Sequence, residues 1–356
     1  MHLPVARTPN SIVPVALVTL VAVLLLCGLF FAPSPTAGAR KPEPGPSMPP
    51  VDKLIGPERC GECHRAEYAS WRQSQHQTGF KGMHRTAAAK SIAKSLGIKR
   101  IKSDPSCVRC HYTPVEKRGK VRAGHGVSCE SCHGAAHDWL VVHDDFGGKE
   151  ITSDLETAEH KKWRVQECRE RGMRRPDDAY HLAAQCFECH VISDENLINK
   201  TDHPVGDQFE FLSWAQGEVR HNFLASKGAE NHEPTVARKR YLFVIGCLLD
   251  VEYALRAYAV STTDGKYRQA CAKRVAAGVD CLIKIDGKLT GQPFAGLCAA
   301  LREKPLAEFS PDQLFALAEQ TGTVARALSS STELSAEIDP LLPTTDKYRG
   351  KSLAGQ

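Results

Sequence analysis

Hydrophobic residues follow three different patterns along the 356 residues of the chain. Residues 11–32 are almost wholly apolar, which is typical of an export signal or of a single membrane-anchoring helix. In the region 51–232 the apolar positions are scattered, and only the short stretches 67–74, 85–96 and 178–185 predict helices. The alternation of apolar and polar residues that marks β-strands is almost absent. We therefore expect this region to be helical and irregular.

The last part of the chain has a regular helical pattern. Apolar residues recur at helical spacing from Tyr241 to Ala259, and a second helix is expected after the turn at 262–265. Ser310 is followed by a proline, and a capping residue with proline at the first helical position predicts the start of a further helix. Together these segments predict a small helical bundle.

These patterns divide the chain into parts of different character. In chain order we expect a signal peptide or membrane anchor helix over 1–39, a proline-rich linker over 40–50, a main domain over 51–232, a C-terminal helical bundle over 233–330 and a polar tail over 331–356. The sequence Ala-Gly-Ala at 37–39 is a cleavage pattern, so removal and retention of the first part both stay open. The tail is expected to be disordered from Thr344.

A five-residue motif, Cys-x-x-Cys-His, occurs four times in the main domain. It is the signature of c-type haem attachment, in which two thiols bond to one porphyrin and the next His binds the iron as proximal ligand. The predicted attachment residues are Cys60, Cys63, Cys107, Cys110, Cys129, Cys132, Cys186 and Cys189, and the predicted proximal ligands are His64, His111, His133 and His190. A zinc site built from Cys-x-x-Cys does not need a His directly after each second Cys. We therefore expect four covalently bound haem c groups, each with one iron.

The motifs complete the expected fold. It is mainly α with much irregular structure, and consists of a tetrahaem cytochrome c domain followed by the small C-terminal bundle. Because eight of the 14 Cys belong to the motifs, six remain. Of these, Cys247 and Cys281 lie almost equally far from the turn near Thr263, which predicts a disulfide across a helical hairpin, with buried unpaired thiols as the alternative.

Charge and cysteine use indicate the compartment and the partners. The formal net charge of +5 omits the propionates of the haems, whose negative charges offset it. The positive charge of the polypeptide is therefore no evidence for a nucleic-acid partner, and none is predicted. The strongly charged stretch 149–175 predicts a solvated insertion. Covalent haem attachment takes place outside the cytoplasm, and the remaining Cys fit a compartment that permits disulfides. We expect a periplasmic or extracytoplasmic protein, anchored to the inner membrane if its N-terminal helix is retained.

Two segments resemble a known family. They are 60–76, with the pattern Cys-x-x-Cys-His-x-x-x-Tyr-x-x-Trp-x-x-Ser-x-His, and 126–134, Gly-Val-Ser-Cys-Glu-Ser-Cys-His-Gly. Both are similar to multihaem c-type cytochromes related to the tetrahaem cytochrome that accepts electrons from hydroxylamine oxidoreductase. The resemblance covers about 51–223.

The resemblance also implies second ligands for the irons. It implies that His76 ligates the fourth haem, that His143 ligates the first, with His137 as competitor, and that His221 ligates the third. The second haem of the tetrahaem carrier is five-coordinate, which leaves the second site open.

For the second haem of this chain, His203 is the expected ligand. It lies in Asp-His-Pro-Val-Gly, which is similar to a Gly-His-Pro element of relatives although Asp replaces Gly. His84 is the alternative.

The expected function follows from iron ligation, because an iron with two imidazoles has no vacant position for a substrate. The leading hypothesis is an exported carrier that passes electrons between a donor and an acceptor redox protein in a respiratory chain. The alternative is an oxidoreductase acting on a small nitrogen compound at a five-coordinate second haem. No catalytic residue is predicted. A third hypothesis is the haem-bearing subunit of a larger membrane complex.

Overall fold

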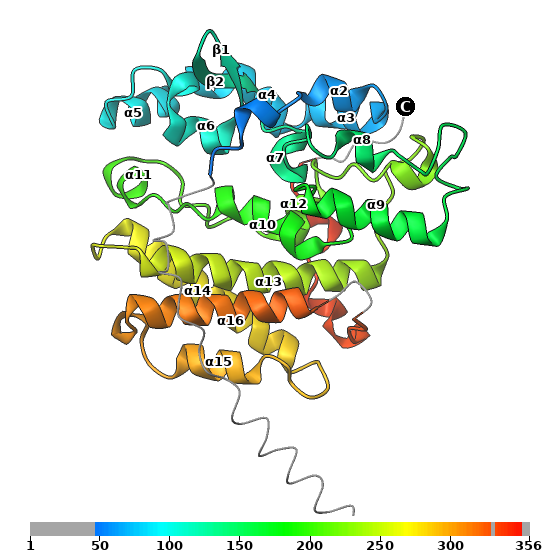
Figure 1. The fold of residues 1–356 in the computed structure, drawn as a ribbon. Helices are drawn as coiled ribbons and strands as arrows, with labels where there is room; N and C mark the ends of the chain where they lie inside the picture. The colour runs from blue at the N-terminus through cyan, green and yellow to red at the C-terminus, as the bar shows by residue number, and fades with distance from the viewer. Residues whose placement is uncertain (1–46, 329–331, 351–356) are drawn as a thin grey trace, which may run out of the picture. The chain divides into compact units, whose positions relative to one another are not determined.

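The computed structural model describes residues 47–328 and 332–350. These residues form a mainly helical structure with one β-hairpin, and much of the chain between the helices is irregular (Figure 1). The expected fold class is confirmed. The predicted signal or anchor and most of the predicted linker lie outside the described residues. No helix within the described ranges has the length and the apolar character needed to cross a membrane.

The first half of the described chain consists of short elements. They are η1 (Val51–Lys53), α2 (Pro57–Gly61), α3 (Arg65–Gln73), α4 (Gln75–Gly82), η2 (Met83–Arg85), α5 (Ala87–Ser95), η3 (Ile101–Ser103), α6 (Pro105–His111), β1 (Thr113–Lys117), β2 (Lys120–His125), α7 (Cys129–His133), α8 (Leu140–His143), α9 (Ala158–Glu170), α10 (Ala179–His190), α11 (Glu195–Lys200), α12 (Phe211–Gln216) and η4 (Leu224–Ser226). The helices predicted at 67–74, 85–96 and 178–185 are confirmed as α3, α5 and α10.

The β-hairpin was not predicted. Strands β1 and β2 pair antiparallel, with Val115 opposite Arg122 and an irregularity between Thr113 and Pro114. The two residues between the strands, Arg118 and Gly119, both have positive φ, at 56° and 68°. Two consecutive left-handed residues are typical of the tightest hairpin turns, so the local signal lay in this turn and not in the strand pattern.

The second half contains longer helices. They are α13 (Val236–Ala259), α14 (Lys266–Asp286), α15 (Ala295–Arg302), η5 (Leu306–Glu308), α16 (Pro311–Ala327), η6 (Ala336–Leu341) and η7 (Thr345–Lys347). The predicted start of α16 is confirmed, because Ser310 and Gln313 form a reciprocal capping box. The predicted disulfide between Cys247 of α13 and Cys281 of α14 is also confirmed.

Helix α13 is the centre of the packing. It contacts α14 and α16 within the bundle, and it also contacts α10 and α12 from the motif-bearing part. Residues from α10 to η6 therefore contribute to one hydrophobic core, in which Phe187, Leu248, Leu282 and Ile338 are almost completely buried. The boundary predicted at 232 stays a prediction, and the core extends across it.

The charged stretch 149–175 is mostly exposed, as expected for a solvated insertion, but part of it packs against the rest of the protein. The stretch 149–175 contains the helix α9, in which Cys168 is fully buried and Arg164 is 7% exposed. Arg164 and Glu156 form a buried ion pair, with Nη2 and Oε2 2.6 Å apart. Because this packing uses charged side chains, no hydrophobic pattern in the sequence reveals it.

The tail is ordered at least to residue 350. Asp339 forms an ion pair with Arg240 of α13, and Arg349 exchanges backbone hydrogen bonds with Ser213 and Glu218. Residues 351–356 lie outside the described ranges. The expectation of disorder from Thr344 was therefore wrong for 344–350. The tail is held by hydrogen bonds and ion pairs. Its sequence therefore has no hydrophobic pattern from which this order could have been predicted.

Candidate haem-binding sites

Each Cys-x-x-Cys-His motif lies in or at the end of a short helix. The first motif spans the end of α2, the second ends α6, the third forms α7, and the fourth ends α10. A helical turn places the two thiols of each motif on the same side, and the following His continues from that turn. The local geometry therefore matches what one porphyrin needs from two cysteines and a histidine.

A buried carboxylate joins the first and third motifs. Glu130, between the two cysteines of the third motif, is 2% exposed. It accepts hydrogen bonds from the backbone N–H groups of Ile55 and Gly56, at 3.0 and 2.9 Å, and from that of Ala136, at 2.9 Å. Because Gly56 immediately precedes α2, these bonds hold α2 and α7 together.

Histidines from distant parts of the chain face one another in four pairs. The distances between ring centres are 6.3 Å for His64 and His143, 6.0 Å for His111 and His203, 6.2 Å for His133 and His221, and 6.4 Å for His190 and His76. Each pair contains one motif histidine and one histidine implied as a second ligand. An iron bound by two imidazoles through bonds of about 2 Å separates the ring centres by roughly 6 Å, so each pair has the spacing that fits one haem iron.

Backbone carbonyls determine which ring nitrogen is left free. The Nδ1–H of His133 donates to the carbonyl oxygen of Arg174 at 2.9 Å, and that of His203 donates to Pro204 at 2.9 Å. His221 donates in the same way to Val219, at 2.6 Å, and His143 donates to Leu140. A carbonyl can only accept, so Nε2 of each ring keeps its lone pair. This is the arrangement found in metal-ligating histidines.

The buried histidines are held neutral. Burial lowers the pKa of His111, His133 and His190 to about 4, and it also lowers the pKa of His76 and His203. The neutral imidazole is the form that binds a metal ion. The protonation state therefore favours ligation at neutral pH.

Thiols of different motifs approach one another. A hydrogen bond between the thiols of Cys60 and Cys129 lowers the pKa of Cys60 and raises that of Cys129. A second one joins Cys110 and Cys189. Helix α7 also contacts both α2 and α10. The four motifs therefore follow the spatial order first, third, fourth, second, which differs from their order in the sequence.

Comparison with known proteins agrees with the haem-attachment motifs. Residues 59–134 match the family model of cytochrome c554 and c-prime. The chain is also 24% identical over 177 residues to cytochrome c-554 of Nitrosomonas europaea, an alignment that covers 48% of this chain and 68% of that protein. The chain is related to the multihaem c-type cytochromes. The resemblance stated from the motifs is confirmed. The matches support electron transfer as the function and covalently bound haem c as the cofactor.

A second relative matches over a short segment. The dissimilatory sulfite reductase MccA of Wolinella succinogenes is 54% identical over 35 residues, which cover 9% of this chain and 5% of that protein. No solved structure matches the chain. The family match ends at residue 134, so the role of α13–α16 is argued from their own contacts.

The competing histidines have other neighbours. The side chain of His137 is 66% exposed, and its Nδ1 pairs with the carboxylate of Asp138. His84 lies near Lys102, and burial together with that positive charge lowers the pKa of His84. His84 Nδ1 is buried and has no hydrogen-bond partner among the described residues.

Several residues of the site were not found from the sequence. They are Glu130, the carbonyl groups that accept from the histidines, Phe209 and Arg274. The Phe209 ring stacks on His190, with ring centres 4.3 Å apart and planes 13° apart. Arg274 of α14 donates to the His190 carbonyl, across 84 positions of sequence. Only the fold brings such residues together, and no local pattern marks them.

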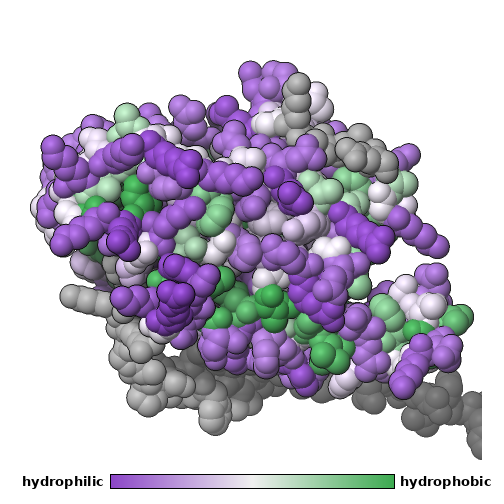
Figure 2. Space-filling view, turned by 90° about the horizontal axis from the view of Figure 1, so that it is seen from above, coloured by the Kyte–Doolittle hydropathy of each residue, from purple (hydrophilic) through white to green (hydrophobic). Residues whose placement is uncertain are grey.

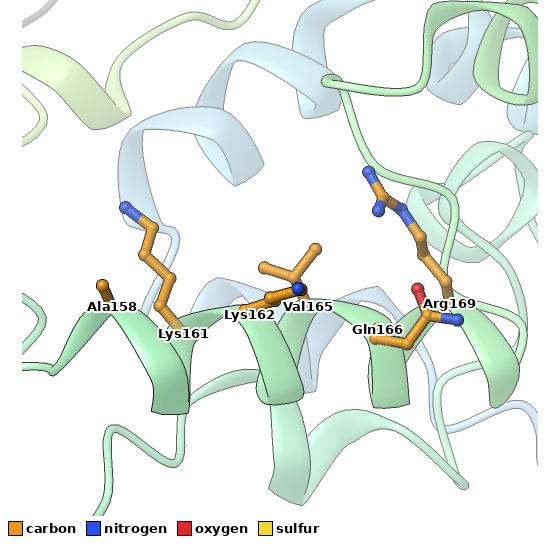
Figure 3. A pocket seen from close by; sticks show the side chains of 6 residues that line it. All are labelled: Ala158, Lys161, Lys162, Val165, Gln166 and Arg169. Atoms are coloured by element: carbon orange, nitrogen blue, oxygen red, sulfur yellow. The ribbon is translucent and has the colours of Figure 1, made fainter.

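The surface around the sites is mainly hydrophilic. Figure 2, which views the molecule from above Figure 1, shows polar side chains over most of that face, with separate apolar areas between them. An open hollow runs along one side of α9 and is lined by Lys161, Lys162, Val165 and Arg169, with Ala158 and Gln166 (Figure 3). None of the eight paired histidines lines this hollow, so it is a surface feature separate from the candidate haem sites.

Proposed function

We propose that this protein is an exported tetrahaem c-type cytochrome that carries electrons between redox partners in a respiratory chain. The observation that carries the proposal is the pairing of all four motif histidines with four further histidines at ring-centre distances of 6.0 to 6.4 Å. In this proposal Cys60, Cys63, Cys107, Cys110, Cys129, Cys132, Cys186 and Cys189 hold the porphyrins covalently. The pairs His64 with His143, His111 with His203, His133 with His221 and His190 with His76 bind the first, second, third and fourth irons.

The residues of the chain prepare these sites. Haem supplies a reversible one-electron couple when it is bound. Hydrogen bonds from Nδ1 to backbone carbonyls orient the rings of His133, His203 and His221. Burial lowers the pKa of His111, His133 and His190, which keeps these imidazoles neutral. Two imidazoles at each iron exclude a substrate and favour fast exchange of electrons without a change of ligands.

The order of the motifs supports a relay. The thiol contacts between Cys60 and Cys129 and between Cys110 and Cys189 support close spacing within two pairs of sites, first with third and second with fourth. The third and fourth motifs lie on contacting helices, α7 and α10. We therefore propose that electrons enter and leave near the first and second sites, which are the two ends of the series.

The enzymatic alternative requires an open position at the second haem. His203 faces His111 with ring centres 6.0 Å apart, and its Nδ1–H donates to Pro204, so its Nε2 is free to bind. No contact among the described residues favours an open position at this motif. We therefore propose carrier function and no catalytic step at this site.

Export and partners are part of the proposal. The disulfide between Cys247 and Cys281 supports an oxidising compartment, as does covalent haem attachment. We propose a periplasmic or extracytoplasmic location, a donor and an acceptor redox protein as partners, and attachment to the membrane only if the N-terminal segment is retained.

Spectroscopy of the purified holoprotein tests the proposal. Intact mass is expected to show four haem groups bound covalently, and the ferric electron paramagnetic resonance spectrum is expected to be wholly low-spin and unchanged by cyanide or nitric oxide. Fewer than four haems would overturn the count. A high-spin signal that accounts for one quarter of the iron and responds to nitric oxide would favour the enzymatic alternative.

A further inference from the structure

Arg274 joins the C-terminal bundle to the fourth motif. It projects from α14 and is 9% exposed. Its Nη1–H groups donate to the carbonyl oxygen of His190, at 3.1 Å, and to that of Gly206, at 2.7 Å. Its Nε–H donates to Asp250 of α13. One guanidinium therefore ties the peptide of a proposed iron ligand to two helices outside the part of the chain that matches the cytochrome family model.

The surroundings of His190 are closely packed. Gly206 has a φ of +76°, and a Cβ at this position would lie 2.2 Å from the His190 carbonyl oxygen. Phe209 stacks on the imidazole of His190, and the guanidinium carbon of Arg274 lies 6.0 Å from the centre of that phenyl ring. The positive charge is thus fixed beside the histidine and cannot move into solvent.

One donor of Arg274 has no acceptor in the part of the chain that the structure describes. Nη2 is buried and has no hydrogen-bond partner among the described residues. A buried guanidinium group without a partner is costly, because its N–H groups lose the hydrogen bonds they make in water. A carboxylate is the acceptor that best matches this donor, and each haem carries two propionates.

In the ion pair of Arg274 with Asp250, the positive group lies nearer to the fourth motif than the negative one. Asp250 meets the guanidinium at Nε, whereas Nη1 faces the His190 carbonyl. The positive end of the pair is therefore nearer to His190. A positive charge in a buried environment favours the state with one more electron, because screening by water is weak there.

We propose that Arg274 is a positioning residue for the haem of the fourth motif: it anchors the peptide of His190, binds a propionate through Nη2, and raises the reduction potential of that haem. This inference rests on the proposed tetrahaem function. It gives the bundle a role in electron transfer, because α13 and α14 contribute Asp250 and Arg274 to the surroundings of a redox centre.

Spectroelectrochemistry of the holoprotein tests this role. In the variant Arg274→Met, the reduction potential of one of the four haems is expected to fall by at least about 59 mV. For a one-electron couple this equals a tenfold change in the ratio of oxidised to reduced haem. Asp250→Asn removes the opposing charge and is expected to move the same couple upward. Arg274→Lys keeps the charge and is expected to leave this couple near its wild-type potential.

Arg268→Met is the matched control. Arg268 lies on the same helix but donates to the hydroxyl groups of Tyr258 and Ser261, at 3.1 and 2.9 Å, so all four potentials are expected to stay unchanged. If Arg274→Met unfolds, Asp250→Asn still decides the sign of the shift. Four couples that do not move in any variant would overturn this inference alone, whereas a wild-type protein without four couples would overturn the proposed function.

Discussion

At the residue scale, orientation and exposure separate His143 from His137, the two candidate ligands of the first haem. His143 and His137 lie six positions apart, and the sequence left both open for the first haem. His143 donates to the carbonyl of Leu140 and faces His64, whereas the exposed His137 pairs with Asp138. The fold thus favours His143 as the ligand, although the sequence shows the same residue type at both positions.

A substitution at this position tests the choice. His143→Ala is expected to convert one quarter of the ferric iron to high-spin, because the first haem loses its sixth ligand, and to create one cyanide-binding site per molecule. Electron paramagnetic resonance and optical titration measure both effects. His137→Ala is the matched control and is expected to leave the spectrum low-spin; the reverse result would assign the ligand to His137.

At the element scale, α9 is held by buried charges. Glu156 accepts hydrogen bonds from Arg164 at 2.7 and 2.6 Å and pairs with His160, and Arg164 also donates to the carbonyl of His143 at 2.8 Å. Helix α9 therefore supports α8, which carries a proposed ligand. The hydrogen bond and charge of Arg164 hold the pKa of Glu156 at about 2.

This pKa predicts a pH-dependent stability. Because the pKa of Glu156 is lower in the folded protein than its ordinary value of 4.5, its stabilisation is complete above pH 4.5 and is lost as the pH falls toward 2. Glu156→Gln is expected to lower the free energy of unfolding by about 2 kcal/mol at pH 7, with a smaller difference at pH 3. Denaturant titration at both values measures it. Glu167→Gln, which removes the more exposed pair with Arg171, is expected to change stability little; equal effects of the two variants would contradict the argument.

Close packing of α13 and α14 gives a second test at this scale. A Cβ on Gly278 would lie 2.6 Å from Cγ2 of Val251, whereas one on Gly296 of α15 would meet nothing within 4 Å. Gly278→Val is expected to lower the free energy of unfolding by about 1 to 3 kcal/mol, because the helices must separate. Gly296→Ala is expected to raise it by up to about 1 kcal/mol. Thermal unfolding compares the two, and a neutral Gly278→Val would show that the helices are packed less tightly than described.

At the scale of the whole molecule, the shared core couples the bundle to the haem sites. Helix α10 ends in the fourth motif, and its residues Tyr180 and Phe187 are buried in the same core as Leu255 of α13. The Tyr180 hydroxyl donates to Glu252 at 2.9 Å, and Arg326 of α16 donates to that hydroxyl at 2.9 Å. Polar and apolar contacts therefore both join the two parts.

Removal of the disulfide tests this coupling. The bridge closes a sequence separation of 34 residues, so replacing both Cys247 and Cys281 with Ser is expected to cost about 3 to 4 kcal/mol. Because the core is shared, the Soret band and the far-ultraviolet circular dichroism are expected to change at the same denaturant concentration. Cys271→Ser, which removes a buried thiol but no bridge, serves as control. Separate transitions for the two probes would show that the two parts unfold independently.

The sequence by itself determined the features that a few neighbouring residues encode. These are the attachment motifs, the capped start of α16, the helical character of α13, and the disulfide, which follows from equal spacing about one turn. A thioether pair, a helix cap or an amphipathic period needs only residues within one or two helical turns, so its signal survives in a linear pattern.

Only the tertiary structure decided which groups meet across the fold. It brought His190 next to Phe209 and Arg274, held α2 against α7 through Glu130, and buried Arg164 with Glu156. The physical reason is that long-range contacts between polar groups depend on the path of the whole backbone. A charged residue has the same sequence pattern whether it lies in water or pairs inside the protein.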